Sequence, residues 1–79
     1  MPTTEELGIA LAADVLKAVD ETGDEALVTD INKIIEASSS ALQEAFMAAV
    51  RAQRAEAKAR QLLNTRIARA KAAAKAAQG

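Results

Sequence analysis

The sequence predicts an all-α protein, an antiparallel helical hairpin whose second helix extends far past the first. It also predicts that the protein assembles into oligomers. Residues 24–78 contain no glycine or proline, so nothing in the composition stops a helix there. Gly23 marks a turn before this stretch. Sixteen of the 19 apolar residues larger than alanine lie within residues 1–50, so any core must form there. So few bulky side chains in 79 residues predict that partner subunits supply further stability.

The first helix is predicted to begin after Thr3. Thr3 and Glu6 have the spacing of a capping box, in which each side chain accepts a hydrogen bond from the other's backbone. An apolar face follows at helical spacing, made of Leu7, Leu11, Val15 and Val19. Gly8 lies within this face and predicts a close approach of another helix.

The turn at Gly23 is predicted to be short. Glycine tolerates the positive φ that commonly ends a helix, and Asp24 can cap the helix that follows. Four carboxylates flank this turn, but their spacing differs from that of a calcium-binding EF-hand. Helix caps account for them, and we expect no metal site.

The three serines at 38–40 leave two interpretations open. A break there would let Ser40 cap a third helix, with Gln43 completing a capping box. We favour one continuous helix, because the apolar stripe from Leu27 to Ala49 stays in phase across the serines. A helix from residue 40 to 78 would be roughly 58 Å long, about twice the first helix, so its end should protrude.

The apolar side chains of residues 27–50 serve two expected purposes. Ile31, Ile34 and Ile35 are expected in the hairpin core. Phe46, Met47 and Val50 point partly away from this stripe and are expected to form an exposed interface. The candidate self-association residues are therefore Ile31, Ile34, Ile35, Leu42, Phe46, Met47 and Val50.

Charge divides the chain into two parts. Residues 1–50, the body, hold two basic and ten acidic residues, a net charge of −8. Residues 51–79, the arm, hold eight basic residues and Glu56, a net charge of +7. Such a basic helix can contact phosphates of DNA or RNA, or pair with the acidic body of another copy. The candidate phosphate-binding residues are Arg51, Arg54, Lys58, Arg60, Arg66, Arg69, Lys71 and Lys75.

Several classes of function are disfavoured. Without histidine, cysteine, tyrosine or tryptophan, and with no base beside its hydroxyl groups, the chain lacks the usual catalytic combinations, so we expect no enzyme and no cofactor. The arm lacks the bulky apolar face of a membrane-surface helix. The N-terminus lacks the features of a signal peptide, which favours the cytoplasm, or a virion if the protein coats nucleic acid.

Part of the chain resembles R-body structural proteins, the bacterial "killing trait" family. The resemblance is carried by a motif of the form A-V-x-A-Q and its neighbours, namely Ala41, Ala45, Phe46, Ala49, Val50, Gln53, Gln61 and Thr65. Residues 32–37 resemble the segment that precedes it in the family. The chain departs from the family in the charges of its arm. The resemblance implies a small subunit that polymerises into a coiled, extensible ribbon.

Two functions follow as hypotheses. The first is a non-enzymatic structural protein that self-assembles into a filament, ribbon or oligomer. The second is a nucleic-acid-binding or packaging protein, such as a filamentous virus coat subunit, whose basic arm contacts phosphates.

Overall fold

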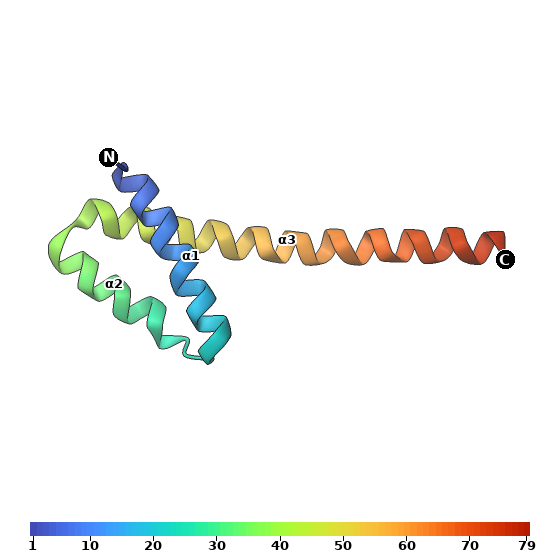
Figure 1. The fold of residues 1–79 in the computed structure, drawn as a ribbon, viewed down its shortest axis with the longest axis horizontal. Coiled ribbons are helices and arrows are strands. Elements are labelled where there is room, and N and C mark those ends of the chain that lie inside the picture. Colours follow the sequence, from blue (N-terminus) through green and yellow to red (C-terminus); the bar gives the residue numbers. More distant parts are fainter.

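The computed structural model describes all residues 1–79 and confirms an all-α fold without strands. Helix α1 spans Thr4–Thr22, α2 spans Ala26–Ser38 and α3 spans Ser40–Gln78. The first two helices and the start of α3 form the body, from which the rest of α3 projects as the arm (Figure 1). The molecule measures 62 × 28 × 17 Å, so its length is that of α3.

Helix α1 begins and ends as the sequence predicts. The Thr3 hydroxyl accepts a hydrogen bond from Glu6 N at 3.0 Å, and the Glu6 carboxylate accepts one from Thr3 N at 3.2 Å. The helix ends at Gly23, whose φ of 74° is the left-handed conformation that glycine adopts without strain. Asp24 Oδ1 then accepts a hydrogen bond from Ala26 N at 3.1 Å, which satisfies a donor at the start of α2.

The prediction of one continuous second helix is wrong, because the chain breaks at Ser39. This residue is extended (φ −157°, ψ 105°), its N–H donates to Ile35 O, and its Oγ accepts from Leu42 N at 3.1 Å. One serine therefore ends α2 and caps α3, in competition with the helical backbone hydrogen bonds. The alternative of a break is confirmed, although the cap is Ser39 rather than Ser40.

Gln43 has a different role from the capping box considered for it. Its side-chain amide donates to Asn32 Oδ1 at 3.0 Å, so it joins α3 to α2 beyond the break. This partly buried hydrogen bond links the start of α3 to the middle of α2.

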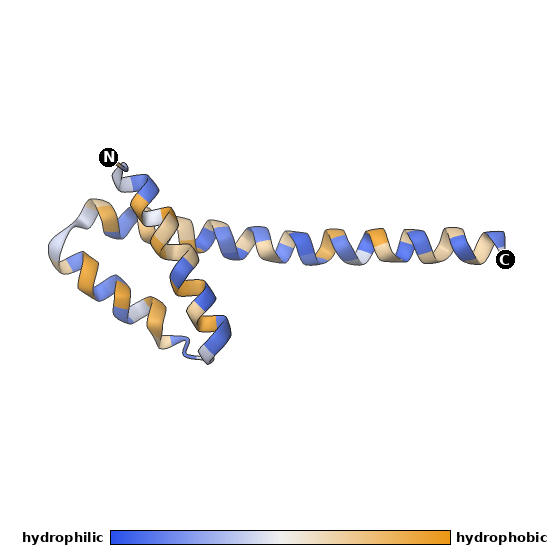
Figure 2. Cartoon of the chain, in the orientation of Figure 1, coloured by the Kyte–Doolittle hydropathy of each residue, from blue (hydrophilic) through white to orange (hydrophobic).

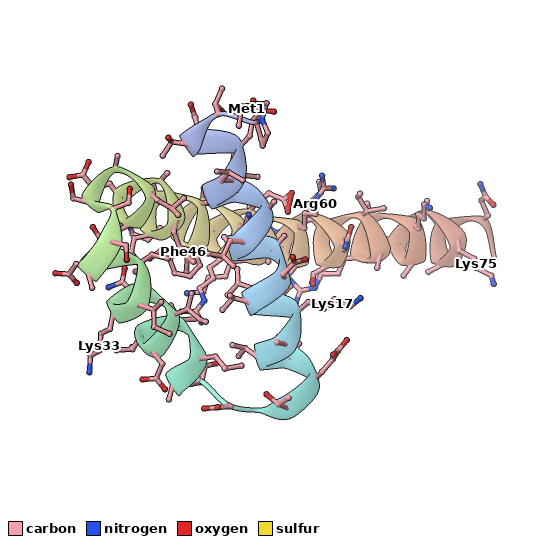
Figure 3. The ribbon with its side chains drawn as sticks, turned by 60° about the vertical axis from the view of Figure 1, so that its left-hand side comes forward. Met1, Lys17, Lys33, Phe46, Arg60 and Lys75 are labelled. Carbon is pink, nitrogen blue, oxygen red and sulfur yellow. The ribbon has the colours of Figure 1, made fainter.

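The core lies where α1 crosses α3 rather than between the two halves of a hairpin. Phe46 is fully buried there (Figure 3). Around it lie six buried residues, of which α2 supplies only Val28, and the full set is Ala12, Val15, Val19, Val28, Ala49 and Val50. Helix α1 packs mainly on α3, whereas α2 makes smaller contacts with α3 and with α1. The predicted antiparallel pair of helices is therefore not the main packing contact.

Hydropathy follows this arrangement. Figure 2 shows strongly apolar residues mainly on α1, α2 and the start of α3, whereas along the arm hydrophilic residues alternate with weakly apolar ones. In the arm, every residue except Gln53 is exposed. The arm holds its helical form without tertiary contacts over most of its length, which its alanine content favours.

The crossing of α1 and α3 depends on Gly8. A Cβ atom added at Gly8 would lie 2.8 Å from both the carbonyl carbon and the Cβ of Ala45, and 2.9 Å from Phe46 N. These distances are shorter than van der Waals contact, and two of the three atoms are backbone. The expectation of close helix approach at Gly8 is confirmed.

Gly8→Ala should therefore destabilise the body. Alanine would gain about 1 kcal/mol in helix propensity, but forcing the helices apart typically costs roughly 1–3 kcal/mol and also loosens the contacts of Phe46. The thermal unfolding midpoint should fall. Ala10→Gly, at an exposed position of the same helix, measures the propensity difference alone. A higher midpoint for Gly8→Ala would contradict the close crossing.

Ser40→Pro should leave stability nearly unchanged. Proline is favoured at the first position of a helix, and Ser39 already has the extended conformation that precedes proline. Glu44→Pro, one turn later, should cost about 3 kcal/mol or more because it removes an interior hydrogen bond. Chemical denaturation compares the two variants. Equal losses would indicate that α2 and α3 form one helix.

Candidate functional site

Two of the predicted self-association residues lie in the core of the single chain. Phe46 is 0% exposed and Val50 is 2% exposed. The expectation that they form an exposed edge is wrong. The break at Ser39 turns α3 beneath α1, so that α1 covers residues that a continuous helix would have carried beyond its reach.

The remaining predicted residues are covered to different extents. Ile31, Ile35 and Met47 are half-buried at the edge of the core, and Leu42 is half-buried as well. Ile34 is 67% exposed, so its assignment to the core is wrong. Helix α2 meets the other helices through Val28 and its neighbours, and Ile34 falls on the outer side of that contact face.

The arm carries all eight predicted phosphate-binding residues on its surface. Two of them have acidic partners: Arg54 Nη2 lies 3.0 Å from Glu25 Oε2, and Arg60 Nε lies 2.9 Å from Glu56 Oε2. Both pairs are largely exposed, so each contributes little to stability. The other six cations make no ion pair, and they are Arg51, Lys58, Arg66, Arg69, Lys71 and Lys75.

The unpaired cations do not surround the arm evenly. Arg51, Lys58 and Arg69 share one face of α3 at helical spacing, while Lys71 and Lys75 lie on another. Arg60 and Lys75 project away from the helix in Figure 3. The shared face can approach a row of phosphates without moving any element of the body.

Bulky apolar side chains also lie on the arm, without cover from the body. Leu62 is 57% exposed, Leu63 51% and Ile67 43%. Leu63 and Ile67 share a face with Ala70 and Ala74, at the spacing of a helix-packing stripe. The candidate self-association residues derived from the sequence omitted this stripe. Its spacing and its place on the protruding part of the helix are both readable from the sequence, and the structure adds that no residue of the body covers it.

Two grooves lie in the corners where α1 crosses α3. The first is lined by the C-terminal half of α1 and by the start of the arm, with charges of both signs that include Lys17, Asp20 and Lys58. The second lies beside the N-terminal half of α1. It is apolar at its base, with charges only at its edge, and its lining is Thr4, Glu5, Ile9, Ala41, Glu44, Ala45, Ala48, Ala49 and Ala52.

A hydrogen bond anchors the wall of the second groove. Gln53 Nε2 donates to the carbonyl oxygen of Ile9 at 3.2 Å. Gln53 is half-buried, whereas the Ile9 side chain is 49% exposed. The backbone of α1 is thus fixed against α3 at this point, and the Ile9 side chain stays available at the groove.

No group of three or more acidic, histidine or cysteine residues is arranged to hold a metal ion. None of the three helices contains an apolar run of the length and low charge that membrane crossing takes.

Comparison with known proteins gives no assignment: no family model, curated protein or solved structure matches this chain.

Proposed function

We propose that this chain is a non-enzymatic structural subunit that self-associates through its arm. The observation that carries the proposal is the half-exposed stripe of Leu63 and Ile67 on a helix that the body does not cover. A filament or ribbon of the kind implied by the resemblance to R-body proteins is one form such an assembly can take, and a closed oligomer is another.

Apolar burial supports this proposal. Covering a Leu or Ile side chain typically contributes about 1.5–3 kcal/mol relative to leaving it in water. The core of the single chain contains one phenylalanine, four valines and two alanines, which is little apolar packing for a chain of this length. A neighbouring copy that covers the arm would add apolar contact where the chain alone has none.

Charge supports it as well. The body carries −8 and the arm +7, and beyond its first turns, where Arg54 pairs with Glu25, the arm extends away from its own body. Two copies can therefore bring opposite charges together by placing the arm of one against the body of the other. Such complementarity accelerates association and selects the orientation of the contact.

The proposal predicts an apparent mass that rises with protein concentration in sedimentation velocity experiments. The double variant Leu63→Lys with Ile67→Lys should remain a monomer, because both substitutions add charge to the apolar stripe. Ala68→Lys with Ala72→Lys is the matched control, since it adds the same charge at the same spacing on the opposite face. A wild-type chain that stays monomeric at every concentration would refute self-association.

A second candidate function, binding to duplex nucleic acid, is favoured by the six unpaired cations of the arm. Three of them, Arg51, Lys58 and Arg69, share one face. Contacts of this kind are insensitive to sequence and weaken steeply with salt, because each neutralised phosphate releases counterions. The chain has no tyrosine or tryptophan, and its one phenylalanine is buried, so stacking on bases is not available.

If the arm binds phosphates, random-sequence duplex DNA should bind at low salt. The logarithm of the binding constant should then fall linearly with the logarithm of the salt concentration, with a steep negative slope. Changing Arg51, Lys58 and Arg69 together to Gln should reduce that slope by roughly 2–3 units. Changing Arg54 and Arg60 to Gln should reduce it less, because both already pair with glutamates. Absence of binding at low salt would remove this function.

A further inference from the structure

We propose that the apolar groove beside the N-terminal half of α1 receives the arm of a second copy, and that the exchange is reciprocal. The two α3 helices then run antiparallel, in a symmetric dimer. This inference rests on the proposed self-association and specifies the surface that the arm contacts.

The groove has the chemistry of a site for a cationic, alanine-rich helix. Its floor is formed by alanines of α3, including Ala45, Ala48 and Ala52, which let another helix approach closely. Its wall presents the half-exposed side chain of Ile9. The carboxylates of Glu5 and Glu44 stand at its rim and have no ion-pair partner within the chain.

The arm has the complementary chemistry. Its stripe of Leu63, Ile67, Ala70 and Ala74 is narrow and apolar. Cations flank this stripe on both sides, Arg66 on one and Lys71 on the other. An arm that lies with its stripe on the alanine floor therefore brings cations to the rim of the groove, where the glutamates are.

The length of α3 sets the register. When two copies of Ser40–Gln78 overlap fully in antiparallel orientation, Ala70 of one lies level with Ala48 of the other, because each is equally far from its end of the helix. By the same rule Ile67 lies level with Arg51, the neighbour of Ala52, and Ala52 lines the groove together with Ile9. This register therefore places the half-exposed Ile67 of one copy at the level of the groove that the half-exposed Ile9 of the other copy lines.

Electrostatics disfavours the simpler pairing of arm with arm. Side by side and parallel, two arms would bring +7 against +7, with Glu56 as the only acid in each. Like charges at this density oppose association at ordinary ionic strength. The antiparallel arrangement lessens this repulsion, because residues 68–78, which hold Arg69, Lys71 and Lys75, lie beside residues 40–50 of the other copy, part of a body of charge −8.

Cysteine cross-linking tests the arrangement directly, because the chain has no cysteine of its own. Ala48 and Ala70 are exposed, and within one chain they lie roughly 33 Å apart along α3, too far for a short thiol-to-thiol cross-linker. The double variant Ala48→Cys with Ala70→Cys should therefore cross-link only between copies. We expect a strong covalent dimer on a denaturing gel, and a weaker one when Glu5→Gln and Glu44→Gln are added.

The controls distinguish this arrangement from others. Ala48→Cys alone, Ala70→Cys alone, and Ala48→Cys with Ala72→Cys, whose second site faces away from the groove, should give little dimer. Cross-linking by Ala70→Cys alone would indicate arm–arm pairing and overturn the inference, while self-association itself would stand. If the chain sediments as a monomer and neither pair of cysteines gives a covalent dimer, both self-association and the proposed dimer are overturned. Binding to duplex DNA would not change that conclusion.

Discussion

The close crossing of α1 over α3 is the constraint on which the rest of the structure depends. Gly8 lets the two helices approach until an added Cβ would be only 2.8 Å from Ala45. This distance allows a small set of side chains to enclose Phe46 completely. A chain of 79 residues with few bulky apolar residues forms a core here because the helices are close, not because the side chains are large.

The same crossing produces both the arm and the grooves. Helix α1 contacts α3 near the start of α3, at Ala45 and Phe46. The residues of the arm that follow its first turns therefore extend beyond the reach of α1. Because α1 crosses α3 obliquely rather than lying along it, an open corner remains on either side (Figure 1). The exposed stripe and the groove proposed to receive it thus have one geometric cause.

Local chemistry was the part of the fold that the sequence predicted well. Thr3, Glu6 and Gly23 act through atoms within a few residues, so their roles follow from spacing alone. The break at Ser39 could not be predicted from the stripe, because an apolar stripe that stays in phase is compatible with both a continuous helix and a break. The choice was made by hydrogen bonds of one hydroxyl and by contacts distant in the sequence, such as Gln43 with Asn32.

This break explains the errors at the candidate site. With a continuous helix, Phe46 and Val50 would lie near the end of the reach of α1, and an exposed edge would follow. With the break, they become the centre of the core, and Ile34 is left outside it. The exposure of the arm was predictable in either case, because it depends only on the difference in length between the first helix and residues 40–78.

The two proposed functions use different faces of the same helix and can therefore coexist. The stripe containing Leu63 and Ile67 faces the groove in the proposed dimer, whereas Arg51, Lys58 and Arg69 lie on a separate face. In the antiparallel register, Arg69 of one copy lies almost level with Arg51 of the other, so the dimer would gather cations from both chains along one edge. Assembly would then increase the density of positive charge available to phosphates, since a single arm contributes only half of that edge.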